Sequence, residues 1–175
     1  MAGLLRPSAP LIALAGWLVP GGGYWLLGKR PRALVIGITI LLLYLLGILF
    51  GGIRVVDVPG YDALGQPLMV EVRRPVNGRA QIVPQRALTA RPLTEIADKP
   101  WFIPQSLMGP INFIAAKVSL VVSRGADSAD STSSFVRRSH GRMFEIGTLY
   151  TAIAGMLNLL AIIDSTSLAP PGGKR

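Results

Sequence analysis

The chain alternates between long apolar stretches and shorter polar, basic segments. Residues 33–53 contain no charged side chain and are rich in Leu and Ile. A helix needs about 20 mostly apolar residues to cross a bilayer, and soluble helices usually keep a polar face that this stretch lacks. Residues 143–163 form a second such stretch, with Glu145 near its start. Both stretches are predicted to be transmembrane helices.

Two further apolar stretches are less regular. Residues 10–28 carry no charge, but Pro20 and the glycines after it would break a helix in water. A membrane tolerates such a break when neighbouring helices or water satisfy the freed backbone groups. We expect a transmembrane hairpin with residues 33–53; a cleaved secretory signal is the alternative. Residues 101–122 contain two prolines and Lys117, so they either cross, dip in and return, or lie along the interface.

The distribution of Lys and Arg favours a crossing by residues 101–122. Basic residues near span ends are retained on the cytoplasmic side, so the basic link at 29–32, which has no acid, is predicted to be cytoplasmic. Residues 54–100 are then extracytoplasmic. If 101–122 crosses, the basic loop at 124–142 returns to the cytoplasm, in agreement with the rule. Four spans with both chain ends outside are therefore expected.

A β-hairpin is predicted at residues 69–83. Apolar residues alternate with polar ones before Asn77-Gly78, a pair that favours a type I′ turn because both central residues need positive φ. Pro75 indicates an exposed strand. Since two strands alone are marginally stable in water, the hairpin is expected to rest on the membrane surface, on the spans or on a partner.

Small and polar residues recur at helical spacing within the apolar stretches. In lipid, helices associate through close packing of small residues and through interhelical hydrogen bonds. The predicted helix-packing residues are Gly47, Gly51, Gly147, Thr151, Gly155 and Asn158. A second set is predicted to face inward from the third segment: Gln105, Asn112, Ala116, Ser119 and Ser123. The alternative role for these polar stripes is a pathway for a small solute.

Composition agrees with a membrane location and excludes several kinds of chemistry. Of the 175 residues, 50% are apolar and 15% are charged, and the formal net charge is +9. The absence of Cys excludes disulfides and thiolate catalysis, and the single His excludes a multi-His metal site within one chain. The chain also lacks the common phosphate-binding and hydrolase motifs. We therefore predict no catalytic, cofactor-binding or metal-ligating residues, and no nucleic-acid partner.

A local motif at residues 16–32 suggests a family. It combines Pro-Gly-x-Gly, an aromatic pair, Leu-Gly and a basic turn, and its defining residues are Pro20, Gly21, Gly23, Tyr24 and Gly28. This motif resembles the two-transmembrane-helix domain family. Together with residues 145–164, it is similar to an uncharacterised bacterial family of unknown function. The resemblance implies an integral membrane protein and supplies no catalytic residues.

These observations predict an all-α polytopic membrane protein with about four transmembrane helices and a small extracytoplasmic β-hairpin insertion. The expected function is non-enzymatic: a scaffold or accessory subunit in a bacterial inner membrane, in contact with the lipid bilayer and with other membrane subunits or itself. A small transporter or channel component is the alternative. The predicted segments are a hairpin at 1–53, an extracytoplasmic segment at 54–100, a third transmembrane or re-entrant helix at 101–123, a cytoplasmic loop at 124–142, a last span at 143–164 and a flexible tail at 165–175.

Overall fold

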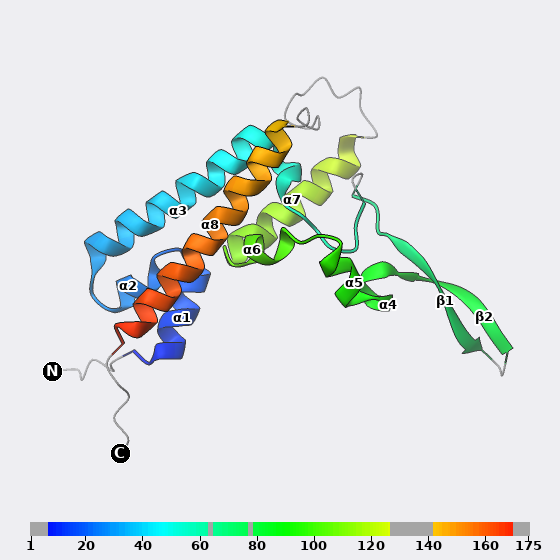
Figure 1. Ribbon diagram of the computed structural model, residues 1–175, viewed down its shortest axis with the longest axis horizontal. Helices are drawn as coiled ribbons and strands as arrows, with labels where there is room; N and C mark the ends of the chain where they lie inside the picture. Colours follow the sequence, from blue (N-terminus) through cyan, green and yellow to red (C-terminus); the bar gives the residue numbers. More distant parts are fainter. Residues whose placement is uncertain (1–6, 63–64, 77–78, 127–141, 170–175) are drawn as a thin grey trace, which may run out of the picture.

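The fold is mostly helical, as predicted. A computed structural model describes residues 7–62, 65–76, 79–126 and 142–169. Figure 1 shows an elongated helical bundle from which a β-ribbon projects at one end. In chain order the elements are α1 (Ala9–Leu18), α2 (Gly22–Leu26), α3 (Arg30–Gly51), η1 (Ile53–Val55), β1 (Met69–Val76), β2 (Arg79–Arg86), α4 (Ala87–Ala90), α5 (Pro92–Ala97), α6 (Phe102–Ser106), α7 (Pro110–Ala126) and α8 (Arg142–Ser167).

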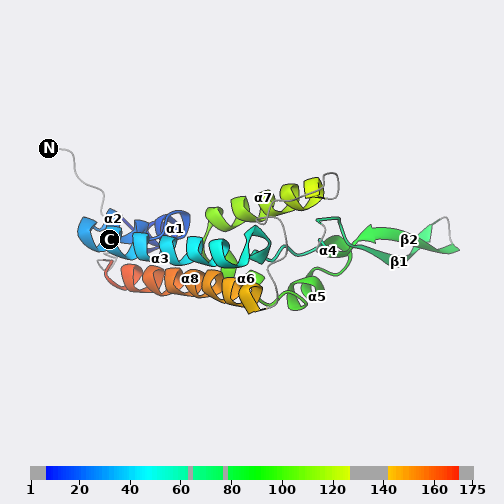
Figure 2. The ribbon, with the colours of Figure 1, turned by 90° about the horizontal axis from the view of Figure 1, so that it is seen from above.

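Two long helices, α3 and α8, form the axis of the bundle. They lie side by side and run in opposite directions (Figures 1 and 2). Close approach depends on glycine: a Cβ on Gly147 would lie 2.6 Å from the carbonyl oxygen of Gly47 and 2.7 Å from the Cα of Gly51. The structure thus places three of the predicted packing residues at one helix–helix contact.

A first helical hairpin, α1 and α2, packs against the C-terminal half of α8. Pro20 has no amide hydrogen, and Gly21 has a φ of +82° that L side chains rarely adopt. The chain therefore leaves α1 at Leu18 and turns back into α2. A Cβ on Gly23 in α2 would lie 3.1 Å from Ile12 of α1, so the two short helices lie against each other.

A second helical hairpin, α6 and α7, enters the bundle from the opposite end. Its turn contains Gly109, which has a φ of +77°, and a Cβ there would overlap the carbonyl oxygen of Trp17 in α1. The tips of the two hairpins therefore touch inside the bundle. From this tip α7 runs back toward the ribbon end, where its Ser119 shares a cavity lining with Arg54 and with Phe144 of α8.

The number of long helices differs from the expected four spans. Only α3 and α8, among the described residues, are long and apolar enough to cross a membrane. The stretch at 10–28 breaks after Leu18, and the stretch at 101–122 breaks at the Gly109 turn and returns. The end of α3 lies beside the start of α8, and the two helices are antiparallel. One further crossing by the chain that connects them would place these two ends on opposite sides of the bundle, which does not fit this pair. The described flanks of the 124–142 segment thus lie at the same end of the bundle as Arg54.

The predicted β-hairpin is confirmed as a two-stranded antiparallel ribbon. Met69 pairs with Arg86 at its base and Val76 pairs with Arg79 near its tip. Residues 77–78, where the type I′ turn is predicted, lie outside the described residues. The ribbon contacts the rest of the protein mainly through α4, and it extends away from the bundle (Figures 1 and 2).

The buried apolar core lies where α3, α7 and α8 meet. It consists of Ile40, Tyr44, Val56, Met108, Ala115, Ala116 and Ala154. In contrast, the outward face of α3 exposes large aliphatic side chains, among them Val35, which is 66% exposed, and Leu49, which is 61% exposed. The bundle is therefore apolar on its outside as well as in its core.

We predict that Gly147→Ala weakens the α3–α8 contact. The added methyl group meets backbone atoms, which cannot rotate away, so the loss is expected to be about 1–3 kcal/mol, in the range of other overpacking substitutions. Thermal unfolding in a fixed detergent measures it as a lower midpoint. The control is Leu149→Ala on the same helix, where the side chain is 46% exposed. Equal midpoints for Gly147→Ala and the wild type would contradict this contact.

Candidate functional site

The candidate site is a row of fully buried polar side chains along α8, α6 and α7. Asn158 and Thr151 come from α8, Gln105 from α6 and Asn112 from α7, and each is 0% exposed. Burial of an amide without a hydrogen-bond partner costs several kcal/mol relative to water. A row of this kind therefore requires either mutual bonding or a bound polar ligand.

Asn158 connects the two hairpin tips. Its Nδ2 donates to the carbonyl oxygen of Gly16 in α1 at 3.2 Å and to that of Leu107, beside α6, at 3.0 Å. Both carbonyls lie at points where a helix ends and its own backbone partners are missing. One amide thus satisfies backbone groups from both helical breaks.

Gln105 makes the corresponding link toward the ribbon end. Its Nε2 donates to the carbonyl oxygen of Val55 and to the Oγ1 of Thr151, both at 2.9 Å, and its Oε1 accepts from the backbone N–H of Asp57 at 2.9 Å. The side chain therefore ties α6 to α8 and to the segment after η1. This amide has a partner at each of its two terminal atoms.

Asn112 and Asn158 keep unused hydrogen-bonding capacity. The Tyr44 hydroxyl donates to Asn112 Oδ1 at 2.9 Å. Within the part of the chain that the structure describes, Asn112 Nδ2 and Asn158 Oδ1 have no partner. A buried donor and a buried acceptor are thus both available to a water molecule or another small polar species.

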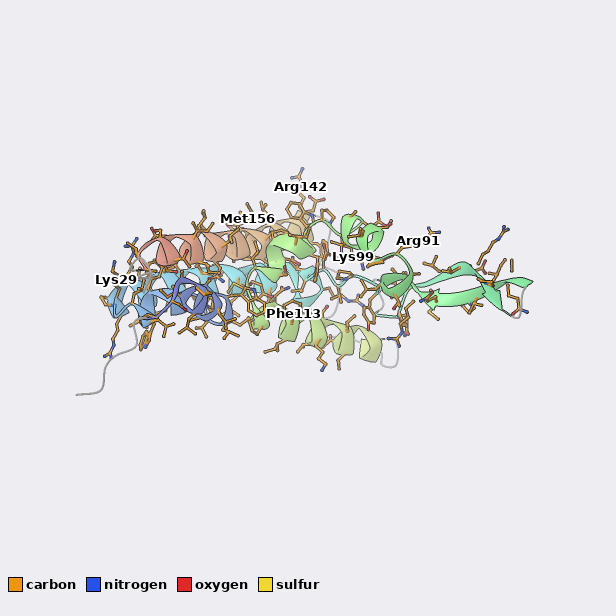
Figure 3. The ribbon with its side chains drawn as sticks, turned by 90° about the horizontal axis from the view of Figure 1, so that it is seen from below. Lys29, Arg91, Lys99, Phe113, Arg142 and Met156 are labelled. Carbon is orange, nitrogen blue, oxygen red and sulfur yellow. The ribbon has the colours of Figure 1, made fainter. Side chains whose placement is uncertain are left out.

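A cavity of about 270 Å³ lies at the ribbon end of the bundle. Its lining includes Arg54, Asp57, Lys99, Ser119 and Phe144. The Lys99 ammonium donates to the carbonyl oxygen of Val58 at 2.6 Å and to that of Tyr61. Lys99 lies between the bundle and the base of the ribbon (Figure 3).

The Asp57 carboxyl beside this cavity is perturbed by its surroundings. Burial raises the pKa of Asp57 above its ordinary value of 3.8, and the nearby Lys99 charge partly opposes that shift. Asp57 and Glu145 also line a neighbouring cavity of about 430 Å³. The polar end of the bundle therefore combines a carboxyl of raised pKa with a cation held by backbone carbonyls.

A second polar cluster lies at the opposite end of the bundle. The Tyr24 hydroxyl donates to the Asp164 carboxylate at 2.5 Å, and Arg32 forms an ion pair with the same carboxylate at 3.0 Å. The Arg32 guanidinium also lies 5.0 Å from the centre of the Tyr24 ring. These contacts join the α1–α2 hairpin, the start of α3 and the end of α8.

The structure separates the residues of the predicted hairpin motif by role. Pro20, Gly21 and Gly23 lie in or beside the turn, and Tyr24 reaches Asp164. Gly28 has a φ of +75°, and a Cβ added there would meet no atom within 4 Å. The motif thus supports the turn, the α2 packing and the end cluster rather than a single site.

The predicted packing face of α8 is internal to the chain. A Cβ on Gly155 would overlap the carbonyl oxygen of Pro104 in α6, and Thr151 and Asn158 bond within the chain as described above. The inward face predicted for the third segment holds Gln105, Asn112, Ala116 and Ser119, all buried. The Ser123 side chain lies outside the described residues.

Sequence reasoning missed the contact between the two turns. It overlooked Gly109, which meets Trp17 of α1. It also overlooked Gly37 of α3, where a Cβ would lie 2.5 Å from the Pro20 carbonyl oxygen of the first turn. The Met-Gly-Pro sequence at 108–110 was an available signal, because Gly followed by Pro marks a turn. Lys117 is exposed on α7, and Glu145 is exposed in the first turn of α8.

The chemistry that the buried row supports is hydrogen bonding. Among the described residues, no group of three or more His, Asp or Glu side chains that could hold a metal ion is present. The buried row consists of amides and hydroxyls, which are neutral across the physiological pH range. It can hold a polar molecule in place but contains no general base.

We predict that Asn158→Leu destabilises the protein by about 1–3 kcal/mol, because the backbone carbonyls of Gly16 and Leu107 lose their donor. The measurement is the thermal midpoint in detergent. Thr166→Val is the matched control on α8, since it removes only a local bond to the Ile163 carbonyl oxygen. A larger loss for the control than for Asn158→Leu would refute the bridging role.

A pH dependence follows from Asp57. A carboxyl whose pKa is higher in the folded than in the unfolded chain stabilises the fold at low pH, and that contribution is lost as the pH rises through the raised pKa. Asp57→Asn removes this titration. The unfolding midpoint of the variant relative to the wild type is therefore expected to rise as the pH is increased above 3.8. A midpoint difference that stays constant from acid to neutral pH would contradict the role of burial.

Comparison with known proteins identifies a family for the chain. Searches of curated proteins and of solved structures found no match. Residues 11–174 match a family of unknown function, DUF6677. This match covers both hairpins, both long helices and the ribbon. The chain therefore belongs to the DUF6677 family of unknown function.

Proposed function

We propose that the protein is a multi-pass bacterial inner-membrane protein that acts as a non-enzymatic scaffold or accessory subunit. Support for the membrane location comes from α3. Of the residues in its most apolar 18-residue stretch, only 22% are buried. The core helix of a soluble protein would be mostly buried, and an exposed apolar helix of 22 residues, about 33 Å long, matches the thickness of a bilayer core.

The two short hairpins are compatible with this location. Non-helical backbone is tolerated at membrane depth where it is buried in protein. The turn after Leu18 and the turn at Gly109 meet that condition, since they contact each other and share Asn158. In the proposed membrane α3 and α8 cross, and each hairpin enters part of the way and returns.

The observation that carries the scaffold proposal is the projecting ribbon. A two-stranded hairpin has little stability of its own in water, and this one leaves large side chains uncovered: Met69 is 59% and Ile82 is 57% exposed. Arg73 and Arg86 add exposed positive charge. The ribbon stands clear of the bundle, so the bundle leaves its strands open to another molecule (Figure 1). It therefore has the properties of an arm that binds a partner subunit.

A small transporter or channel component is the second candidate. It is supported by the unpaired Asn112 Nδ2 and Asn158 Oδ1, both buried within the described part of the bundle. In this case purified protein in proteoliposomes would conduct a small polar solute, and Asn112→Leu would abolish the flux. The two candidates differ in one respect: transport requires the central amides, whereas partner binding requires the ribbon.

The scaffold proposal predicts that a stoichiometric partner co-purifies with the full chain and that replacing residues 69–86 with a short Gly-Ser linker removes it. Affinity purification from native membranes, followed by protein mass spectrometry, measures partner recovery. The double variant Arg73→Gln/Arg86→Gln is expected to lower partner recovery while leaving the bundle folded.

The matched control is Arg142→Gln, which removes an exposed cation from the start of α8. Full partner recovery without the ribbon would contradict the scaffold proposal. Gly155→Leu is a poor test of a partner interface, because that residue packs against α6 of the same chain.

A further inference from the structure

An apolar groove of about 520 Å³ opens between the α1–α2 hairpin and α3. It lies at the end of the bundle opposite the ribbon. Its walls are formed by Leu18 and Val19 at the turn, Trp25 of α2, and Leu34, Ile38 and Leu41 of α3. No charged residue lines it among the described residues.

The groove lining covers a short length of α3. Leu34 and Leu41 are seven positions apart on α3, which corresponds to about 10 Å along the helix. Ile111, at the start of α7, also contributes to the lining. The groove thus has the depth of part of one leaflet. A partner transmembrane helix would need a groove that continues through both leaflets.

Cations surround the outer end of the groove. Arg30 lies 5.8 Å from the centre of the Trp25 ring, which itself lines the groove. Lys29 extends outward from the same end of the bundle (Figure 3). Arg32 is neutralised by Asp164, whereas Lys29 and Arg30 have no ion-pair partner among the described residues.

We propose that this groove binds an anionic phospholipid, with one acyl chain between α2 and α3 and the phosphate against Lys29 and Arg30. An apolar slot that spans part of one leaflet matches a segment of an acyl chain, and unpaired cations at its opening match a negative headgroup. Trp25 lies between the two parts, as expected for an aromatic residue at the headgroup level. The inference rests on the membrane location proposed above and not on the partner of the ribbon.

The test uses the full chain reconstituted with equal amounts of phosphatidylglycerol and phosphatidylcholine. After extraction into a mild detergent, native mass spectrometry is expected to find one retained phosphatidylglycerol per chain and little phosphatidylcholine. Lys29→Gln/Arg30→Gln is expected to lower the apparent affinity for phosphatidylglycerol about 25-fold, from about fivefold for each lost cation. Arg142→Gln, at the other end of the bundle, is the charge control.

A matched pair of bulky variants tests the groove itself. Ile38 lines the groove and is 54% exposed, whereas Leu42 lies one turn further along α3, is not part of the lining and is 55% exposed. Ile38→Trp is expected to displace the lipid, and Leu42→Trp is expected to retain it. Both side chains are exposed, so both tryptophan variants are expected to stay folded. This comparison therefore tests the groove even if Lys29→Gln/Arg30→Gln loses stability.

Four results would overturn the proposal. The first is equal retention of both lipids, and the second is retention of phosphatidylglycerol by Ile38→Trp. The third is competition by millimolar inorganic phosphate, which would indicate an anion site without an acyl chain. The fourth is a dimer that persists in detergent and that Ile38→Trp disrupts, because a second copy of the chain, and not lipid, would then occupy the groove. A chain released from membranes by alkaline carbonate would instead refute the membrane location.

Discussion

The hydrogen bonds of Asn158 are the constraint on which the arrangement depends. Each helical break leaves backbone groups without partners, and inside an apolar bundle such groups must be satisfied by the protein. The single amide of Asn158 serves a carbonyl from each break. The two hairpins are therefore able to end at the same level inside the bundle, with their turns in contact at Gly109 and Trp17.

The remaining features follow from this meeting point. Because both hairpins return, one end of the bundle holds the chain's basic α2–α3 link and the Asp164 cluster, and the other holds the cavity at Asp57 and the ribbon. The close antiparallel packing of α3 and α8 sets the axis of the bundle, and its two ends lie at opposite ends of that axis. In the proposed membrane, each end would present a different surface: a cationic groove opening on one side and a projecting arm on the other.

Sequence patterns predicted the helices α3 and α8, the ribbon and the inward face of the third segment, because each of these depends on a local period that side chains reveal directly. For residues 101–122 they left a return open beside a crossing, and they did not predict that residues 10–28 turn back. A period identifies a helix but not the direction that the chain takes after a break. The charge rule then favoured four crossings, because a crossing by residues 101–122 would return the basic loop at 124–142 to the cytoplasm. Gln105 was placed on the correct face, but its bonds to Val55 and Thr151 join segments distant in sequence.

Sidedness measured by cysteine labelling shows most directly whether the second hairpin returns. The chain has no native cysteine, so single cysteines at exposed Gln81, Arg142, Lys29 and Ser167 report one position each in sealed, oriented membrane vesicles treated with an impermeant maleimide. Positions 81 and 142 are expected to react from one side, and positions 29 and 167 from the other. Reaction of positions 81 and 142 from opposite sides would require the segment that contains α6 and α7 to cross, and would contradict the return of the second hairpin.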